Sequence, residues 1–241
     1  MTPAGRVKSR IVFACSGSAE SIAAIARLAS KFDAEVVALT LDVGQPRELE
    51  GVRQAALAAG AIRAHVLDAR EEFAHHCIVS SFAEQTPTAR PIIARKLVEI
   101  AHIEGATAIA HTGGADDHAG IEAAARASGG SIRVIAAKTG TTGDSPATEA
   151  TLWERSPGKP ELDEPARLEI AFERGLPVSI NGVPMTLTEL IESIATIADA
   201  PPAAIFQAAH EALGDASGAP EATVCLELFK GQHRILSAQH S

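Results

Sequence analysis

The chain has 241 residues, 46% of them hydrophobic, and a formal net charge of -9 at pH 7. This length and apolar content suffice for one domain, or for a large domain joined to a smaller one. The negative charge argues against general binding to nucleic acid or anionic membranes, because both surfaces would repel the protein. The classes that remain are proteins that bind small polar ligands or other proteins.

Membrane-spanning and secreted proteins are also disfavoured. No apolar run approaches the roughly 20 residues that a spanning helix needs, and residues 1–10 lack the apolar core of a secretory signal. We therefore expect a cytoplasmic protein without a membrane partner. The three cysteines, Cys15, Cys77 and Cys225, lack the paired spacing of a zinc site or a disulfide framework, so we expect buried reduced thiols.

The first part of the chain has the pattern of βαβ units around a parallel sheet, because short β-branched runs alternate with helical stretches from Arg10 to about Ala137. Strands are expected at residues 11–15, 35–40, 64–67, 107–110 and 132–136. Helices are expected at 18–32, about 46–59, around 71–79 and 89–104. Right-handed crossovers then give an α/β fold with a doubly wound parallel sheet.

The composition changes after Lys138. Residues 139–150 are rich in Gly, Ser and Thr, which is typical of a loop or linker. We therefore expect two parts, an α/β domain at 1–138 and a smaller α+β C-terminal region at 139–241.

The C-terminal region carries clear turn and helix signals. Asn181-Gly182 lies between two apolar runs, at 178–180 and 183–186, and predicts a type I′ hairpin. Thr186 and Glu189 form a capping box before an amphipathic helix. A helix at 202–213 and a final hairpin, formed by 223–229 and 235–236 with its turn at Lys230-Gly231, complete the expected elements.

The strongest local signal follows the first strand, where the sequence reads Ala14-Cys15-Ser16-Gly17-Ser18-Ala19-Glu20-Ser21. Glycine and small hydroxyl residues let the backbone approach a phosphate, and a helix N-terminus offers N–H donors and the positive end of a dipole. The pattern predicts an anion-binding loop. A purely structural interpretation stays open, because turns between elements are often rich in Gly and Ser.

This loop resembles the A-Y-S-G-G-L-D-T-S loop of argininosuccinate synthases. Ala14, Ser16 and Gly17 match it, whereas Ser18 replaces the second glycine, Glu20 the aspartate and Ser21 the threonine. The resemblance continues in order through 37–45, 67–73, 89–101, 110–118, 152–156, 168–197 and 228–231. The chain is identified as a shortened member of this family with a degenerate loop.

The resemblance implies a PP-loop, HUP-like ATP-binding domain. It also implies an ATP-dependent ligase of arginine biosynthesis, which joins citrulline to aspartate through an adenylated intermediate and releases AMP and pyrophosphate. ATP and Mg²⁺ are the implied cofactors and small amino acids the implied substrates; a homo-oligomer is one expected assembly. The implied nucleotide-binding residues are Ala14, Ser16, Gly17, Ser18, Glu20, Ser21, Leu41, Asp42 and Gly113. The implied amino-acid-binding residues are Thr86, Thr88, Thr112, Asp116 and Asp117. No catalytic residue and no metal ligand is assigned.

The amino-acid site departs most from the family. Only residues 83–89 stand where the family has a longer segment rich in tyrosine, and this chain contains no tyrosine. An alternative is therefore a non-catalytic relative that binds a nucleotide or a protein partner. Two interpretations of Asp42 stay open: it contacts ribose or a metal, or it caps the turn after its strand. Two interpretations of Asp116-Asp117-His118 also stay open: the segment binds magnesium, or it is a polar loop before a helix. His111 is expected to be a hydrogen-bonded structural histidine.

Overall fold

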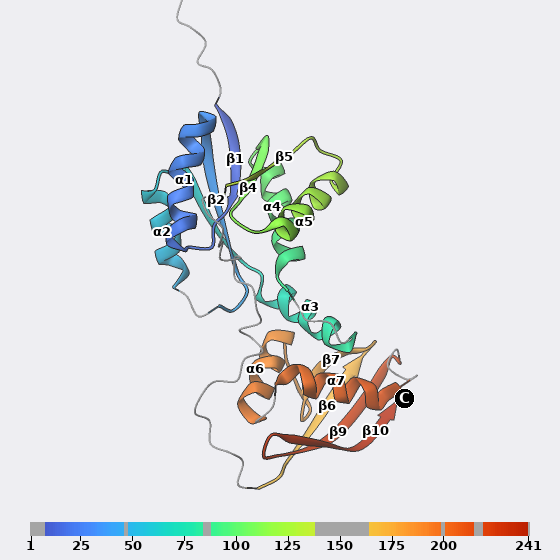
Figure 1. Cartoon of the computed structure of the whole chain (residues 1–241). Helices are drawn as coiled ribbons and strands as arrows, with labels where there is room; N and C mark the ends of the chain where they lie inside the picture. The colour runs from blue at the N-terminus through green and yellow to red at the C-terminus, as the bar shows by residue number, and fades with distance from the viewer. Residues whose placement is uncertain are drawn as a thin grey trace, which may run out of the picture. The chain divides into compact units, whose positions relative to one another are not determined.

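The computed structural model describes residues 8–45, 48–83, 88–137, 164–198, 201–214 and 219–240. The chain divides into two compact units, one of Met1–Ala69 with Ala89–Thr148 and the other of Arg70–Thr88 with Glu149–Ser241 (Figure 1). This division differs from the expected boundary after residue 138, because the helix that begins at Arg70 packs on helices of the second unit. Within the described residues, every helix is too short or too polar to cross a membrane.

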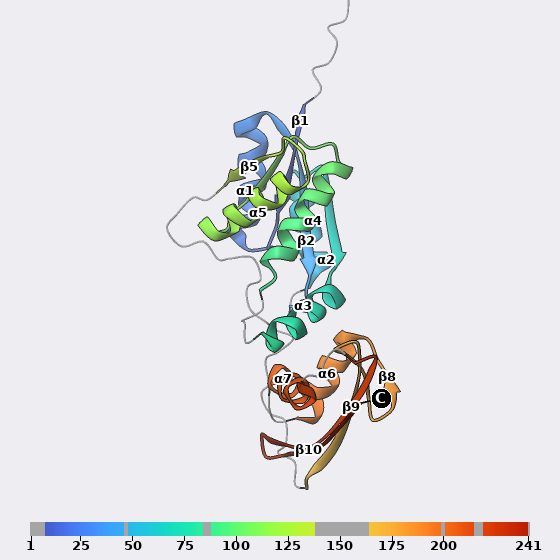
Figure 2. The ribbon, with the colours of Figure 1, turned by 90° about the vertical axis from the view of Figure 1, so that its right-hand side faces the viewer.

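The first unit is built on a parallel five-stranded sheet of order β3-β2-β1-β4-β5. Its strands are β1 (Ser9–Ala14), β2 (Ala34–Asp42), β3 (Arg63–Asp68), β4 (Ala108–His111) and β5 (Arg133–Ala136). Helices α1 (Ala19–Phe32) and α2 (Leu49–Ala58) lie on one side of the sheet, and α4 (Arg90–Ile103) and α5 (Ala115–Ala127) lie on the other (Figures 1 and 2). The predicted doubly wound α/β sheet is confirmed, and each predicted strand agrees with the structure within two residues at either end.

Burial on both faces explains why the central strands of this sheet are largely apolar. Seven of the nine residues of β2 are buried, and such near-continuous apolar runs are typical of parallel strands that are covered by helices on both sides. On the side of α1, the core is formed by alternate strand residues such as Ile11 and Phe13 with Ala24, Ile25 and Leu28 of the helix. The regular alternation fixes which side chains face each layer.

The order of the strands creates a switch point between β1 and β4. The two strands lie side by side in parallel, with Val12 opposite Ile109 and Phe13 opposite Ala110. The chain leaves β1 toward β2 on one side, whereas β4 continues toward β5 on the other. The loops that follow β1 and β4 therefore diverge, and in open α/β sheets such a point is where ligands bind, at the carboxyl ends of the strands.

The second unit is an antiparallel sheet of order β10-β9-β6-β7-β8, together with three helices. The strands are β6 (Ala166–Glu173), β7 (Leu176–Ile180), β8 (Val183–Pro184), β9 (Glu221–Phe229) and β10 (Gln232–His240), and the helices are α3 (Arg70–Phe82), α6 (Leu187–Ile197) and α7 (Pro202–Leu213). Positive φ angles at Asn181-Gly182 and Lys230-Gly231 confirm both predicted turns. Strand β6 and the left-handed Arg174-Gly175 turn that follows it were not predicted, although the residues of β6 alternate between buried and exposed.

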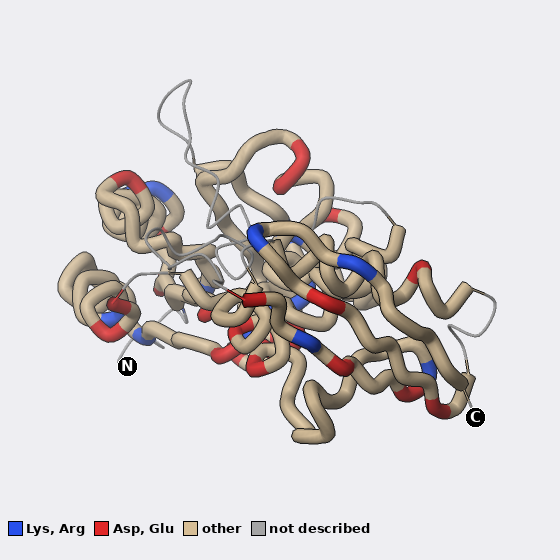
Figure 3. The backbone as a smooth tube through the Cα atoms, turned by 90° about the horizontal axis from the view of Figure 1, so that it is seen from below, with Lys and Arg blue, Asp and Glu red and all other residues tan. Residues whose placement is uncertain are grey.

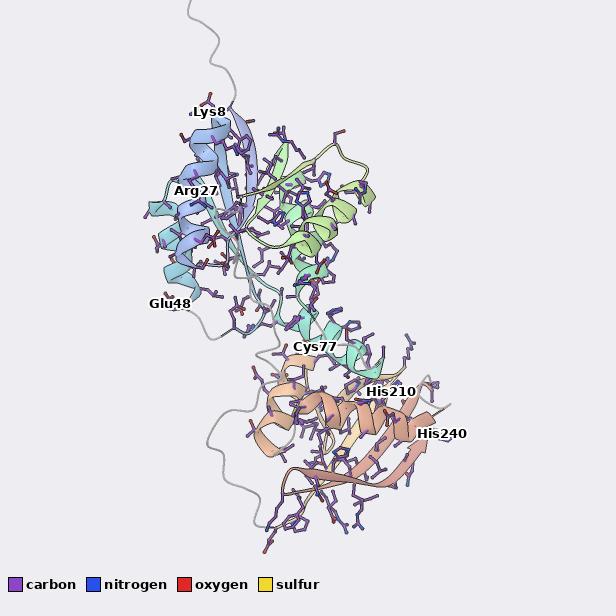
Figure 4. The ribbon with its side chains drawn as sticks, in the orientation of Figure 1. Lys8, Arg27, Glu48, Cys77, His210 and His240 are labelled. Carbon is purple, nitrogen blue, oxygen red and sulfur yellow. The ribbon has the colours of Figure 1, made fainter. Side chains whose placement is uncertain are left out.

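Helix α3 packs against α6 and α7 of the second unit. The Glu71 carboxylate accepts hydrogen bonds from the backbone N–H groups of Leu187 (2.8 Å) and Thr188 (3.1 Å) at the start of α6. At the other end of α3, the Phe82 ring stacks on the His210 ring of α7, with 3.9 Å between the ring centroids. Figure 4 labels Cys77 on α3 and His210 on α7. These contacts explain why residues 70–88 cluster with the C-terminal part of the chain.

The predicted capping box of α6 is confirmed. The Thr186 hydroxyl accepts from the Glu189 N–H (3.3 Å), and the Glu189 carboxylate accepts from the Thr186 N–H (2.8 Å). The prediction for the cysteines is only partly correct. Cys15 and Cys77 are buried free thiols, whereas Cys225 is half-buried because it lies on the face of β9 away from the core.

Candidate functional site

The loop between β1 and α1 makes a sharp turn at the switch point. Gly17 has φ of 78°, which is in the left-handed region that favours glycine. The loop is tied to β2, because the Cys15 N–H donates to the Leu39 carbonyl (2.8 Å) and the Thr40 hydroxyl donates to the Cys15 carbonyl (2.9 Å). The loop therefore starts from a fixed position on the sheet before the chain enters α1.

Serine hydroxyls accept hydrogen bonds from two backbone N–H groups of this loop. Ser18 is the N-cap of α1, and its hydroxyl accepts from the Ser21 N–H (3.2 Å). The Ser18 N–H in turn donates to the Ser16 hydroxyl (3.4 Å), and the Ser21 hydroxyl donates to the Ser18 carbonyl (3.0 Å). A phosphate would use these same N–H donors. An anion that uses the N–H groups of Ser18 and Ser21 must therefore replace these two hydroxyls.

The end of β2 carries the next predicted residues. The Asp42 carboxylate accepts from the Gly44 N–H (2.9 Å), and the Leu41 carbonyl accepts from the side-chain amide of Gln45 (2.7 Å). This hydrogen bond agrees with the capping alternative for Asp42, and a contact with ribose or a metal stays a prediction. Glu20, the expected counterpart of the family's aspartate, lies half-buried in the first turn of α1.

The second wall of the switch point is the turn from β4 into α5. Thr112 and Gly113 are buried, and the helix begins at Ala115. The prediction of a polar loop at 116–118 is wrong, because these residues form the first turn of α5. The Asp117 carboxylate accepts from the Gly114 N–H (2.7 Å), which stabilises the helix start there.

Arg90, at the start of α4, reaches this turn. Its Nε lies 3.0 Å from Oδ1 of Asp117, and its Nη1 lies 3.6 Å from Oδ2 of Asp116. The Asp117 side chain is 8% exposed, whereas that of Asp116 is 86% exposed. Arg90 is not among the site residues predicted from the sequence. The local sequence shows only that Arg90 is a cation beside Pro91 at the start of an amphipathic helix. This pattern does not predict that Arg90 pairs with Asp117.

Two histidines meet on the same wall. Nε2 of His111, at the end of β4, lies 2.9 Å from Nδ1 of His118 in α5. One ring must donate and the other accept, so the contact requires that at least one ring is neutral. The prediction of a hydrogen-bonded structural His111 is confirmed.

A small pocket lies at the wall formed by β4 and α5. A pocket of about 10 Å³ is lined by Ala14, Arg90, Ile93, His111, Gly113, Asp117 and Ile121. This volume suits about one water molecule. No group of three or more His, Cys, Asp or Glu side chains within the described ranges is arranged to hold a metal ion.

The fold brings most of the predicted site residues to one edge of the first unit. Those at the carboxyl ends of β1, β2 and β4 are Ala14, Ser16, Gly17, Ser18, Glu20, Ser21, Leu41, Asp42, Thr112, Gly113, Asp116 and Asp117. Thr88 belongs to the second unit, and Thr86 lies outside the described residues, as does the predicted linker at 139–150.

Comparison with known proteins identifies a matching family and several relatives of this chain. A family model described as "Arginosuccinate synthase N-terminal HUP domain" matches residues 10–145. The argininosuccinate synthase of Symbiobacterium thermophilum is 32% identical over 248 residues, which cover 79% of this chain and 62% of that protein. The argininosuccinate synthase of Oleidesulfovibrio alaskensis is 42% identical over 144 residues, which cover 55% of this chain and 36% of that protein. The chain thus spans less than two thirds of the length of these relatives.

Proposed function

The chain belongs to the argininosuccinate synthase family, and we propose that it binds ATP at the switch point between β1 and β4 and uses it to join an amino acid to aspartate. The observation that supports this best is the Gly17-Ser18 turn, which leads directly into the N-terminus of α1 where the strand order reverses. N–H donors and the helix dipole favour a polyphosphate at such a position.

In this proposal the β1–α1 loop holds the phosphates. Backbone N–H groups from Gly17 to Ser21 donate to phosphate oxygens once the Ser18 hydroxyl gives up its bond to the Ser21 N–H. Leu41 and Asp42 lie on the nucleoside side, at the end of β2, and Gly113 lies on the opposite wall. Glu20 and Asp42 offer the oxygen ligands that Mg²⁺ prefers; when bound, that ion neutralises phosphate charge.

The amino-acid substrates are proposed to lie over the β4–α5 turn. The exposed Asp116 carboxylate in the first turn of α5 is available to an amino or ureido group, and Thr112 directly follows β4. The chemistry needs little acid or base from side chains. The ureido oxygen of citrulline attacks the α-phosphorus, a P–O bond forms and pyrophosphate leaves; the aspartate amine then displaces AMP. Holding the reacting atoms in line is the main demand on the protein.

One observation favours a second candidate, a relative that binds the nucleotide without ligation. Asp117, which the resemblance assigns to substrate, has one carboxylate oxygen beside Arg90 and the other on the Gly114 N–H. A carboxylate held in this way supports the turn rather than a substrate.

Calorimetric titration of ATP with Mg²⁺, followed by a pyrophosphate-release assay, separates these functions. Ligation requires ATP binding and pyrophosphate that appears only when citrulline and aspartate are both present. Binding without pyrophosphate supports the second candidate, and no binding at millimolar ATP rejects both. Gly17→Ala tests the loop, because a side chain is strained at φ of 78°, and Gly60→Ala at φ of 101° is its matched control. Only the first should weaken ATP binding.

A further inference from the structure

One side of the sheet in the first unit is only partly covered. Helix α1 packs on β2, and α2 packs on β2 and β3, whereas α5 covers β5 from the opposite side. The described residues place no third helix next to α1 on its side of the sheet (Figures 1 and 2). A parallel sheet is normally covered by helices on both faces. Among the described residues, therefore, no helix covers the strip beside β5 on the α1 side of the sheet.

The strip is a real groove with an apolar floor. It has a volume of about 130 Å³ and is lined by Ala24, Leu28 and Phe32 of α1, by Ile135, Ala136 and Ala137 at the end of β5, and by Arg27 and Lys31. β4 contributes only the small side chains of Ala108 and Ala110 to this face, so nothing bulky fills the space from below. This volume exceeds the roughly 10–15 Å³ that a water needs and suits a large apolar side chain.

The rim of the groove is basic in a protein that is acidic overall. Arg27 and Lys31 are exposed and lie one helical turn apart on α1, where residues at i and i+4 share a face. The Arg133 guanidinium lies 5.4 Å from the centre of the Phe32 ring and adds a third cation. The lining includes no carboxylate. Figure 4 labels Arg27 on α1, and Figure 3 shows that acidic and basic residues are otherwise interspersed along the described chain.

We propose that the groove between α1 and β5 binds an acidic amphipathic helix of a partner protein. The apolar face of that helix fills the space over Leu28, Phe32 and Ile135, and its carboxylates pair with Arg27, Lys31 and Arg133. A helix in a groove is a common mode of peptide recognition, and charge complementarity selects the partner. The groove is separate from the β1 and β4 loops, so this proposal does not depend on ATP binding.

The test uses two synthetic helical peptides of 18 residues, each labelled with a fluorophore. Both carry Leu at positions i, i+3, i+4 and i+7; one has Glu on the flanks of this stripe and the other has Lys. Fluorescence anisotropy with the full chain should show binding of the Glu peptide and not of the Lys peptide. The double variant Arg27→Glu/Lys31→Glu should weaken binding of the Glu peptide by about tenfold or more and should gain binding of the Lys peptide.

A matched control is Arg53→Glu/Arg126→Glu, which makes the same change of charge on exposed residues of α2 and α5. This control should leave both peptides unaffected. Far-UV circular dichroism and the melting temperature establish that each variant folds. Equal binding of the two peptides, or equal loss in both double variants, would overturn the proposal.

Two further measurements test whether the groove is covered by the chain itself or by a second copy of it. Ala136→Cys in a Cys225→Ser background places a thiol in the groove, and maleimide should modify it at the rate of an exposed thiol until the Glu peptide is added. Protection in the free monomer would mean that the chain covers its own groove. A dimer in sedimentation that the Arg27→Glu/Lys31→Glu variant abolishes would mean that a second copy occupies it. Either result overturns the proposal of a partner helix.

Discussion

Nε of Arg90 lies 3.0 Å from Oδ1 of Asp117, and this pair joins the start of α4 to the first turn of α5. The second Asp117 oxygen accepts from the Gly114 N–H. One nearly buried carboxylate therefore fixes the β4–α5 turn from two sides, and that turn is a wall of the switch point. Its rigidity sets where Thr112 and Gly113 lie relative to the β1 loop.

Replacement of Arg90 should loosen this turn. Arg90→Ala leaves the Asp117 carboxylate without its cation, a change that costs about 3–5 kcal/mol for fully buried pairs. Because the Arg90 side chain is 39% exposed, we expect a loss of about 1–3 kcal/mol in the free energy of unfolding, measured in urea. Arg90→Lys should recover part of it. Arg53→Ala removes an exposed pair with Glu50 and should cost less than about 1 kcal/mol. Equal losses at the two positions would contradict this role.

Gly113 lies directly against the Asp117 side chain. A Cβ built on Gly113 would lie 2.3 Å from Oδ2 and 2.7 Å from Cγ of Asp117, so Gly113→Ala must push that side chain away from Gly114. We expect a destabilisation of about 1–3 kcal/mol in urea unfolding, as for other overpacked sites.

The control lies in the helix that follows. A Cβ on Gly120 in α5 meets nothing within 4 Å, so Gly120→Ala should stabilise the protein by about 0.5–1 kcal/mol through helix propensity alone. Opposite signs for two glycine-to-alanine changes seven residues apart would locate the effect in the Asp117 contact. A stabilising Gly113→Ala would show that Asp117 does not pack there.

These contacts mark the limit of what the sequence predicted. Local patterns sufficed for the Asn181-Gly182 turn and the capping box at Thr186, because each depends on residues within three positions of one another. The doubly wound parallel sheet was predicted from the alternation of strands and helices along the chain. The Arg90–Asp117 pair joins two helices, and the contact of Glu71 with Leu187 spans 116 residues. No periodicity in a single sequence specifies such partners, so Arg90 and the place of α3 in the second unit were not predicted.

Ser18→Gly tests the internal capping of the β1–α1 loop, where we propose that ATP binds. The variant removes the hydroxyl that occupies the Ser21 N–H, at a cost of only a few tenths of a kcal/mol because glycine is a tolerated N-cap. With that donor free, we expect tighter ATP binding in calorimetric titration. Thr186→Gly removes an equivalent cap from α6 and should leave ATP affinity unchanged. Weaker binding by Ser18→Gly would show that the hydroxyl itself contacts the nucleotide.

Glu104 at the end of α4 gives the first unit a pH-dependent contribution to stability. Its side chain is 2% exposed and accepts hydrogen bonds from Arg63 (2.7 Å) and His65 (2.9 Å). Burial raises the pKa of Glu104, but the hydrogen bonds from His65 and Arg63 lower it more, so the pKa lies below its usual value of 4.5. A carboxyl whose pKa is lower in the folded than in the unfolded state stabilises the fold above the unfolded pKa, and this contribution is lost as pH falls through the folded pKa.

Glu104→Gln should therefore lower the free energy of unfolding by about 2–4 kcal/mol at pH 7, since it leaves Arg63 and His65 facing a neutral group. Urea unfolding from pH 7 to pH 3 should show the gap between wild type and variant narrowing below pH 4.5, because protonation makes the native carboxyl neutral as well. Glu99→Gln, on a half-exposed carboxylate of the same helix, should show neither the loss nor the narrowing. A gap that stays constant over this range would mean that Glu104 acts through its shape and packing, with no part played by its charge.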